Sequence, residues 1–226
     1  MLDEEALQFV RFQHPFTLII AGPTSSGKTV LTRDILADNR ETISPQPENN
    51  LRVLWCYGEM QELYKEPIAN TDVIYHEGLC TRGVLEELKP DLVVIDDLMS
   101  RVSNDKEMVD LFTKTSHHIK ISVIFIVQNL FYQTKAMRTI SLNAHYFIIL
   151  RNKRDTQQVF NIGRQMMPDK MKYFARVYGD ATKEPFSHLI IDKHPSSPDE
   201  IKLRCWQEEV KGNGEKGFVV YAPTEK

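Results

Sequence analysis

The eight residues GPTSSGKT at positions 22–29 constrain the fold of this chain more than any other segment. They match the pattern GxxxxGK followed by Ser or Thr, after an apolar run at 16–21 and before a helical pattern at 28–37. In that strand–loop–helix setting the pattern is typical of a phosphate-binding loop, or P-loop. Gly22 and Gly27 let the loop wrap tightly, so that backbone N–H groups face inward, and the helix adds its positive N-terminal end. A glycine turn with a chance lysine is the weaker interpretation.

The loop predicts the ligand as well as the local fold. Lys28 is expected to reach the β- and γ-phosphates of a nucleoside triphosphate, and the Thr29 hydroxyl is expected to bind Mg²⁺. We therefore expect ATP and Mg²⁺ as the bound groups. The predicted phosphate-binding residues are Gly22, Pro23, Thr24, Ser25, Ser26, Gly27, Lys28 and Thr29.

Two further strand ends carry candidate catalytic groups. One apolar run ends in Asp96 and Asp97, and another, at 121–127, is followed by Gln128. Because parallel strands end at the same edge of a sheet, we expect Asp96 in the Mg²⁺ shell and Asp97 to orient or deprotonate the attacking water. The Gln128 amide is expected to hydrogen-bond the γ-phosphate and that water. The alternatives are a solvated strand end or helix cap for the aspartates, and a turn residue for Gln128.

The alternation of apolar runs and helical patterns predicts the fold class. Strands are expected at 16–21, 51–57, 71–75, 91–95, 121–127, 144–150 and 189–191, and helices at 28–37, 81–88, 104–117, 154–165 and 170–178. Residues 41–50, with two prolines, are expected to form a loop. We predict an α/β P-loop NTPase fold of the RecA/ASCE type, a three-layer sandwich with a mostly parallel central sheet and helices on both faces.

The predicted ATPase domain spans residues 1–192. Residues 193–226 begin with a PSSP segment and continue with a charged stretch, so they are expected to form a linker and a C-terminal tail. An added edge strand at 217–222 is one interpretation of the last apolar run.

Composition excludes several classes of protein. No apolar run in the 226 residues approaches the ~20 residues of a membrane-spanning helix, so no membrane span is expected. Cys56, Cys80 and Cys205 lack the spacing of a zinc site or a disulfide framework. The acidic start is unlike a signal peptide, so the chain is expected inside a cell. The net charge of −3 argues against an extended nucleic-acid-coating surface, but not against local basic contacts.

Several motifs together resemble a known family. The order GPTSSGKT, LVVIDD and VIFIVQN is similar to that of the FtsK–HerA superfamily of DNA-pumping ATPases. The segments LWCYGE at 54–59 and RTISLNAHYFIILRNKRD at 138–155 narrow the resemblance. Together they are similar to the viral genome-packaging ATPases of poxviruses, virophages and, most closely, Maverick/Polinton elements and adintoviruses. The resemblance covers residues 14–180.

The resemblance implies an ATP hydrolase that acts as a motor. Such proteins form rings, here a homo-oligomeric pentamer or hexamer, around double-stranded DNA and drive it into a capsid, so capsid or portal-vertex proteins are expected partners. The expected location is the host cell interior, in the cytoplasm or nucleus at viral assembly sites, or in association with the virion. Lys28, Thr29, Asp96, Asp97 and Gln128 match the family's phosphate, metal, catalytic and sensor positions. Many relatives have glutamate in place of Asp97.

The family usually completes its site with an arginine from the next subunit, which stabilises charge on the transferred phosphoryl group. Arg138 is the first candidate here, and Arg151 and Arg154 are the alternatives. For each of them an ordinary surface ion pair is an equally good interpretation. Glu59 is placed either near the nucleotide or at a solvated helix cap. The loops around Lys65, Arg82 and residues 101–106 are candidate DNA contacts or solvated surface.

Two rival functions stay open from the residues alone. One is a P-loop kinase acting on a small molecule or a nucleotide, which the chain length suits. The other is a nucleotide-dependent assembly switch without motor output. The paired Asp96 and Asp97 with a strand-end glutamine favour hydrolysis over both.

Overall fold

The computed structural model describes residues 8–99, 109–129, 134–152, 156–207 and 216–223. Strands make up most of its centre. They are β1 (Phe12–Gln13), β2 (Thr17–Ala21), β3 (Ile43–Ser44), β4 (Leu51–Tyr57), β5 (Thr71–Glu77), β6 (Leu92–Asp96), β7 (Ser122–Val127), β8 (Tyr146–Leu150), β9 (His188–Asp192), β10 (Leu203–Gln207) and β11 (Gly217–Val220).

The helices lie between these strands. The α-helices are α2 (Lys28–Ala37), α3 (Asn39–Thr42), α4 (Arg82–Leu88), α7 (Ser116–Ile119), α8 (Lys135–Asn143), α9 (Gln157–Met166) and α10 (Met171–Ala181). Short helical turns are η1 (Gln8–Val10), η2 (Glu62–Lys65), η4 (Pro168–Lys170), η5 (Asp199–Ile201) and a π-helical turn, η3 (Leu111–Thr115).

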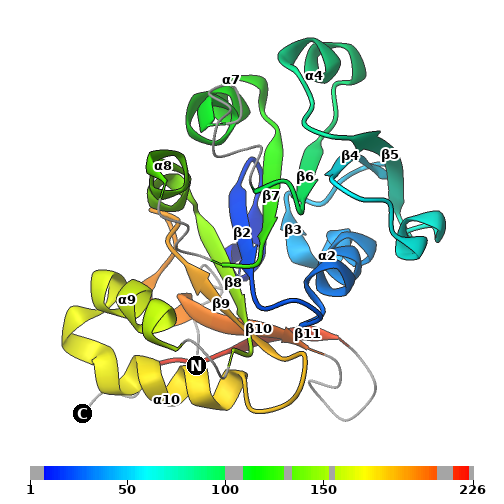
Figure 1. Cartoon of the computed structure of the whole chain (residues 1–226). Helices are drawn as coiled ribbons and strands as arrows, with labels where there is room; N and C mark the ends of the chain where they lie inside the picture. Colours follow the sequence, from blue (N-terminus) through cyan, green and yellow to red (C-terminus); the bar gives the residue numbers. More distant parts are fainter. Residues whose placement is uncertain (1–7, 100–108, 130–133, 153–155, 208–215, 224–226) are drawn as a thin grey trace.

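Nine of the described strands form one large sheet in the order β11-β10-β9-β8-β2-β7-β6-β4-β5 (Figure 1). From β8 to β5 every neighbouring pair is parallel, whereas β9, β10 and β11 extend the sheet with antiparallel pairs. β1 and β3 form a separate two-stranded parallel sheet. Strand β7 lies between β2 and β6, so the strands that end in the P-loop and in Asp96 are not direct neighbours.

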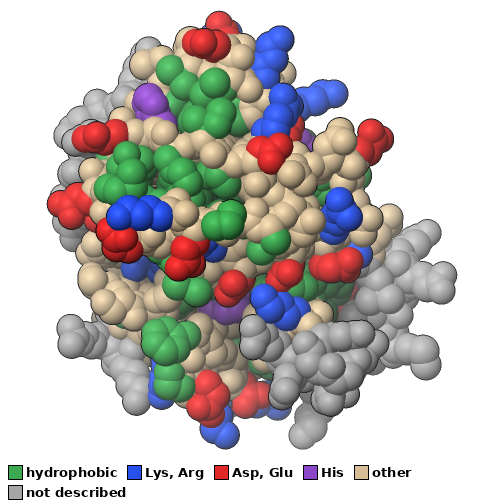
Figure 2. Space-filling view, turned by 90° about the vertical axis from the view of Figure 1, so that its right-hand side faces the viewer, with side chains coloured by type: hydrophobic (Ala, Val, Ile, Leu, Met, Phe, Trp, Pro, Cys, Tyr) green, Lys and Arg blue, Asp and Glu red, His purple; other side chains and the backbone are tan. Residues whose placement is uncertain are grey.

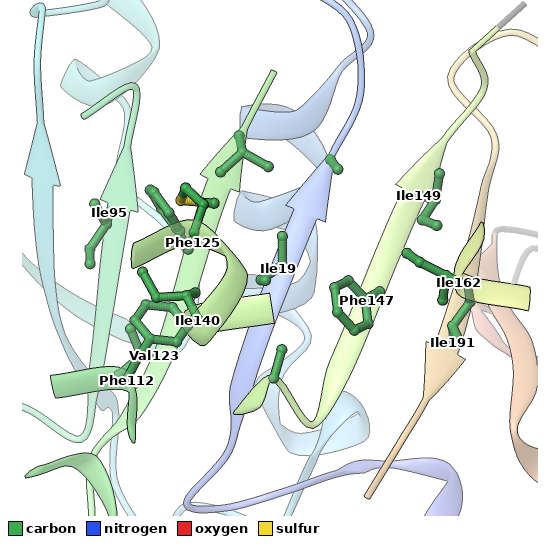
Figure 3. Packing of buried hydrophobic residues seen from close by; sticks show 14 of the residues in the cluster. Ile19, Ile95, Phe112, Val123, Phe125, Ile140, Phe147, Ile149, Ile162 and Ile191 are labelled. Atoms are coloured by element: carbon green, nitrogen blue, oxygen red, sulfur yellow. The ribbon is translucent and has the colours of Figure 1, made fainter. Parts of the chain in front are cut away.

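Both faces of the sheet are covered, which explains the unbroken apolar runs of its central strands. Side chains of β2 alternate between two cores, with Ile19 in one and Leu18 and Ile20 in the other. Helix α2 and turn η2 contribute to the second core, while α4, η3, α8, α9 and α10 contribute to the first. Figure 3 shows the first core, where Phe112 and Ile140 pack over Phe125, and Ile162 lies between Ile149 and Ile191. The predicted three-layer α/β sandwich with a mostly parallel sheet is confirmed.

Three local predictions differ from the structure. The expected loop at 41–50 begins with the end of α3 and with β3. Helix α8 was not expected, although Thr134 caps it by accepting from the Met137 N–H and its buried residues, Met137 and Ile140, have helical spacing. Strand β10 lies in a charged stretch that was assigned to the tail.

Strand β10 escaped detection because it carries a buried arginine. The Arg204 guanidinium donates to the Asp192 carboxylate of β9 at 2.7 Å, and both side chains are fully buried. Its guanidinium carbon also lies 5.7–5.9 Å from the ring centres of Phe12, Tyr146 and Phe218. Charged side chains are rarely buried without such a partner, so local sequence does not indicate this strand. The division of the chain at residue 192 stays a prediction.

Within the described ranges, no helix combines the length and the apolar character needed to cross a membrane.

Candidate active site

Most of the predicted phosphate, metal and catalytic positions line one cavity at the carboxyl edge of the parallel strands, whereas Gly22, Pro23 and Arg138 are not among its lining residues. The P-loop follows β2. Asp96 is the last residue of β6, Asp97 follows it, and Gln128 follows β7. The cavity measures about 340 Å³ and is lined by Thr24, Ser25, Ser26, Gly27, Lys28, Thr29, Val30, Gln61, Leu63, Asp96, Asp97, Ile126, Val127 and Gln128. Crevices at this edge are where open α/β sheets bind ligands.

The two glycines of the P-loop are required by its geometry. Gly27 has φ +90°, a left-handed conformation that side chains disfavour. A Cβ on Gly22 would lie 2.7 Å from the Ser26 hydroxyl oxygen and 3.0 Å from the Leu150 Cβ. The loop therefore closes tightly against β8, which is the curvature that a phosphate cradle needs.

The Lys28 side chain folds back onto the first residues of the P-loop. Its ammonium group donates to the carbonyl oxygens of Gly22 at 2.8 Å and Pro23 at 2.9 Å. Partial burial lowers the pKa of Lys28, and the charges of Asp96 and Asp97 oppose that shift. Two backbone carbonyl groups thus hold the ammonium group at the cavity wall, and phosphate oxygens can replace them as hydrogen-bond acceptors.

Asp96 joins the P-loop helix to turn η2. Its Oδ2 accepts from the Thr29 hydroxyl at 3.2 Å and from the Tyr64 hydroxyl at 2.9 Å. Burial raises the pKa of Asp96, while the hydrogen bonds from Tyr64 and Thr29 act in the opposite direction. Burial also raises the pKa of Tyr64, so its phenol stays protonated and donates. The carboxylate is positioned by two hydroxyl groups from different segments.

Asp97 and Gln128 face each other at the open side of the cavity. The Gln128 amide nitrogen donates to Asp97 Oδ1 at 3.2 Å, and the Thr24 hydroxyl donates to Gln128 Oε1 at 3.5 Å. Asp97 has φ +54°, which turns the chain at the end of β6. Both side chains are exposed to solvent. A water molecule in this part of the cavity would meet a carboxylate and an amide together.

The donor set suits a hard divalent cation. Thr29 Oγ1 and Asp96 Oδ2 present oxygen ligands beside the phosphate loop, and Mg²⁺ prefers a few such protein ligands completed by phosphate and water. Among the described residues no group of three or more His, Cys, Asp or Glu side chains could hold a metal ion by itself.

The remaining candidates lie outside this cavity. Arg138 is exposed on α8, and Glu59 is exposed after β4. Arg151 follows β8, where its backbone N–H donates to the Ser187 carbonyl. Arg154 and residues 101–106 lie outside the described residues. No arginine of the described chain lines the cavity, and the proposed role of Arg138 therefore requires a second subunit.

The proposed DNA contacts in the described residues take part in local ion pairs. Lys65 pairs with Glu62 at 2.7 Å, and Arg82 pairs with Glu86 at 2.7 Å. On the face drawn in Figure 2, Lys and Arg side chains are interspersed with Asp and Glu side chains. The described part of that face thus presents no continuous basic surface.

Sequence reasoning missed Tyr64. Its hydroxyl reaches Asp96 across 32 positions of sequence, from a short turn that no pattern marks as functional. Tyr64 packs against Trp55 of β4 and Tyr75 of β5, an aromatic environment that only the folded structure reveals.

No protein-family model and no curated protein matches this chain. Solved structures do match it. The DNA-packaging ATPase B204 from Sulfolobus turreted icosahedral virus aligns with a TM-score of 0.52 at 13% identity, over 94% of this chain and 99% of that one. The genome-packaging NTPase B204 from Sulfolobus turreted icosahedral virus 2, in complex with ATP-γS, gives 0.51 at 11%, over 93% and 98%. The flagellar accessory protein FlaH from Methanocaldococcus jannaschii gives 0.51 at 13%, over 94% and 92%. At these identities the likeness is one of fold.

Proposed function

We propose that this chain binds Mg-ATP in the P-loop cavity and hydrolyses it. The observation that carries the proposal is the pair of hydrogen-bonded contacts at one edge of the sheet: Thr29 with Asp96, and Gln128 with Asp97. The first pair supplies oxygen ligands for a metal beside the phosphate loop, and the second offers an acceptor and a donor to one water molecule.

Different residues of the chain bind the phosphates, hold the metal and position the attacking water. Backbone N–H groups of the loop and the N-terminal end of α2 receive the phosphates, and Lys28 exchanges the carbonyls of Gly22 and Pro23 for phosphate oxygens. Thr29 and Asp96 would hold Mg²⁺, which would neutralise negative charge on the bound phosphates. Asp97 accepts or orients the proton of the attacking water, and Gln128 holds that water in place. The water oxygen bonds to the γ-phosphorus as the bond to the β–γ bridging oxygen breaks, so that ADP leaves and inorganic phosphate forms.

We further propose that the ATPase is a DNA-packaging translocase that works as a homo-oligomeric ring. Support comes from the sequence motifs in residues 14–180 and from the fold likeness to the packaging ATPase B204. FlaH shares the fold to a similar degree, so the fold does not distinguish packaging from other tasks. In the ring, Arg138 of one subunit would complete the site of its neighbour, while double-stranded DNA passes through the centre and a capsid vertex receives it.

Phosphate release by the purified chain tests both proposals, ATP hydrolysis and DNA translocation. With Mg-ATP alone, slow release of inorganic phosphate is expected, and Lys28→Ala should abolish it. With double-stranded DNA present, mass photometry should show rings and turnover should rise. Turnover without any response to DNA in an assembled ring would reject the translocase. A phosphorylated acceptor in place of free phosphate would reject hydrolysis and favour the kinase.

A further inference from the structure

A second cavity adjoins the phosphate site. It measures about 570 Å³, within the range of sites that bind small ligands, and it shares Gly27 and Val30 with the phosphate cavity. One wall is the flank of α2, with Val30, Leu31 and Asp34, and the other comprises residues 184–188 and strand β10. A molecule with phosphates in the P-loop can therefore extend directly into this space.

The mouth of the second cavity carries an aromatic side chain in an unfavourable conformation. Phe186 is 68% exposed, the most exposed of the large hydrophobic side chains in the described residues. Its backbone has φ +63°, a left-handed conformation that is an outlier for a bulky residue. Exposure and backbone strain both oppose folding, and such features persist where a function requires them.

The Phe186 ring lies against the P-loop itself. A Cβ built on Gly27 would lie 3.2 Å from Phe186 Cδ1, so the ring edge contacts the glycine that precedes Lys28. Glycine at position 27 thus allows the left-handed turn and also leaves room for the Phe186 ring. The contact fixes an aromatic ring beside the place where the phosphates end.

Both walls of the cavity carry side chains that complement a flat, partly apolar ligand. Val30, which directly follows the metal-binding Thr29, is 51% exposed and lines both cavities. The exposed Gln207 lies at the end of β10 and lines the same space with an amide that both donates and accepts. Beside the charged side chains of Asp34, Glu184 and Lys216, the lining thus offers aromatic and aliphatic surfaces and an amide, which fit a nucleobase of either purine type.

We propose that the second cavity binds the nucleobase and ribose of the bound nucleotide, with the base stacked on Phe186. The assignment rests on the proposed function of the P-loop cavity. Base stacking on an aromatic side chain tolerates different bases, because every base has a π-face. The site therefore discriminates strongly between a nucleotide and bare triphosphate, and weakly between ATP and GTP.

Isothermal titration of the full chain in Mg²⁺ tests this assignment with three ligands: ATP, GTP and inorganic tripolyphosphate. The informative variant is Phe186→Asn, which removes the ring but tolerates the left-handed backbone. A second variant, Phe186→Trp, keeps an aromatic ring at this position. The matched control is Leu142→Ala, which removes an apolar side chain that is 61% exposed on α8.

The native chain should bind ATP and GTP with similar affinity and tripolyphosphate at least about tenfold more weakly. Phe186→Asn should lose about tenfold in ATP affinity and leave tripolyphosphate binding unchanged, and Phe186→Trp and Leu142→Ala should bind ATP as the native chain does. Unchanged ATP binding by a folded Phe186→Asn chain overturns the stacking assignment and leaves the proposed function standing. A native chain that binds neither ATP nor tripolyphosphate overturns the proposed function, and the base site with it.

Discussion

The hydroxyl oxygen of Thr29, at the start of α2, lies 3.2 Å from a carboxylate oxygen of Asp96, at the end of β6. The two residues are 67 positions apart, and strand β7 separates the strands that position them. The contact lies at the carboxyl edge of the sheet and lines the same cavity as Gln128, which follows β7. The order β2-β7-β6 therefore brings the Thr29–Asp96 contact and the Gln128–Asp97 contact into one cavity.

Asp97→Asn should separate binding from hydrolysis. The amide keeps the size of the side chain but cannot accept a proton from water, so ATP affinity should change little while turnover falls at least about 100-fold. Titration calorimetry and phosphate release measure the two quantities. Glu59→Gln is the control, because Glu59 is an exposed carboxylate near the same edge that does not line the cavity. Native turnover in Asp97→Asn would remove Asp97 from the mechanism.

Tyr64→Phe should weaken Mg²⁺ binding, most strongly at acidic pH. The Tyr64 hydroxyl stabilises the ionised form of Asp96, so its loss should raise the pKa of a carboxyl group that burial already raises. Because Mg²⁺ binds the carboxylate and not the acid, the pH at which Mg-dependent ATP binding is half-lost should move upward.

Tyr75→Phe provides the comparison for Tyr64. Tyr75 stacks on Tyr64, but its hydroxyl accepts a hydrogen bond from Arg33, whereas the Tyr64 hydroxyl donates to Asp96. It should leave the pH profile of Mg²⁺ binding in place. Identical profiles for Tyr64→Phe and the native chain would show that the phenol does not position the metal ligand.

His188 should make the fold acid-sensitive. Burial lowers its pKa from 6.5 to about 4, so below pH 6.5 the unfolded chain takes up a proton that the folded chain refuses. Above pH 6.5 this histidine does not affect the free energy of unfolding. As the pH falls toward 4, it lowers the free energy of unfolding by up to about 3 kcal/mol. Urea unfolding at several pH values measures the decline. A His188→Gln chain should lose this part of the pH dependence, and an unchanged slope would contradict the assignment.

Two glycines in neighbouring helices should respond oppositely to alanine. A Cβ on Gly163 of α9 would lie 2.6 Å from the Phe174 ring of α10, and overpacking of this kind costs about 1–3 kcal/mol. A Cβ on Gly179 of α10 would meet no described atom within 4 Å, so Gly179→Ala should stabilise the chain by up to about 1 kcal/mol. Denaturant unfolding of both variants measures the difference. Equal effects would mean that α9 and α10 do not pack as closely as described.

Much of the site was predictable because its signals are local. The P-loop is eight consecutive residues between a strand and a helix, and Asp96 and Gln128 are polar residues at the ends of apolar strands. Such patterns depend only on near neighbours in the chain, which also explains why the α/β class and most strands were predicted. The roles of these residues stay predictions, and so does that of Arg138, whose partner would be another subunit.

The sequence by itself determined where the phosphate loop lies, which strand ends carry polar groups and that the sheet is mostly parallel. Only the tertiary structure decided that β7 separates β2 from β6, that Tyr64 bonds to Asp96 and that Phe186 covers Gly27. It also decided that β10 enters the sheet through the buried pair of Arg204 and Asp192. The physical reason is the same for each: these contacts join segments distant in sequence, so their energies depend on packing that no local pattern records.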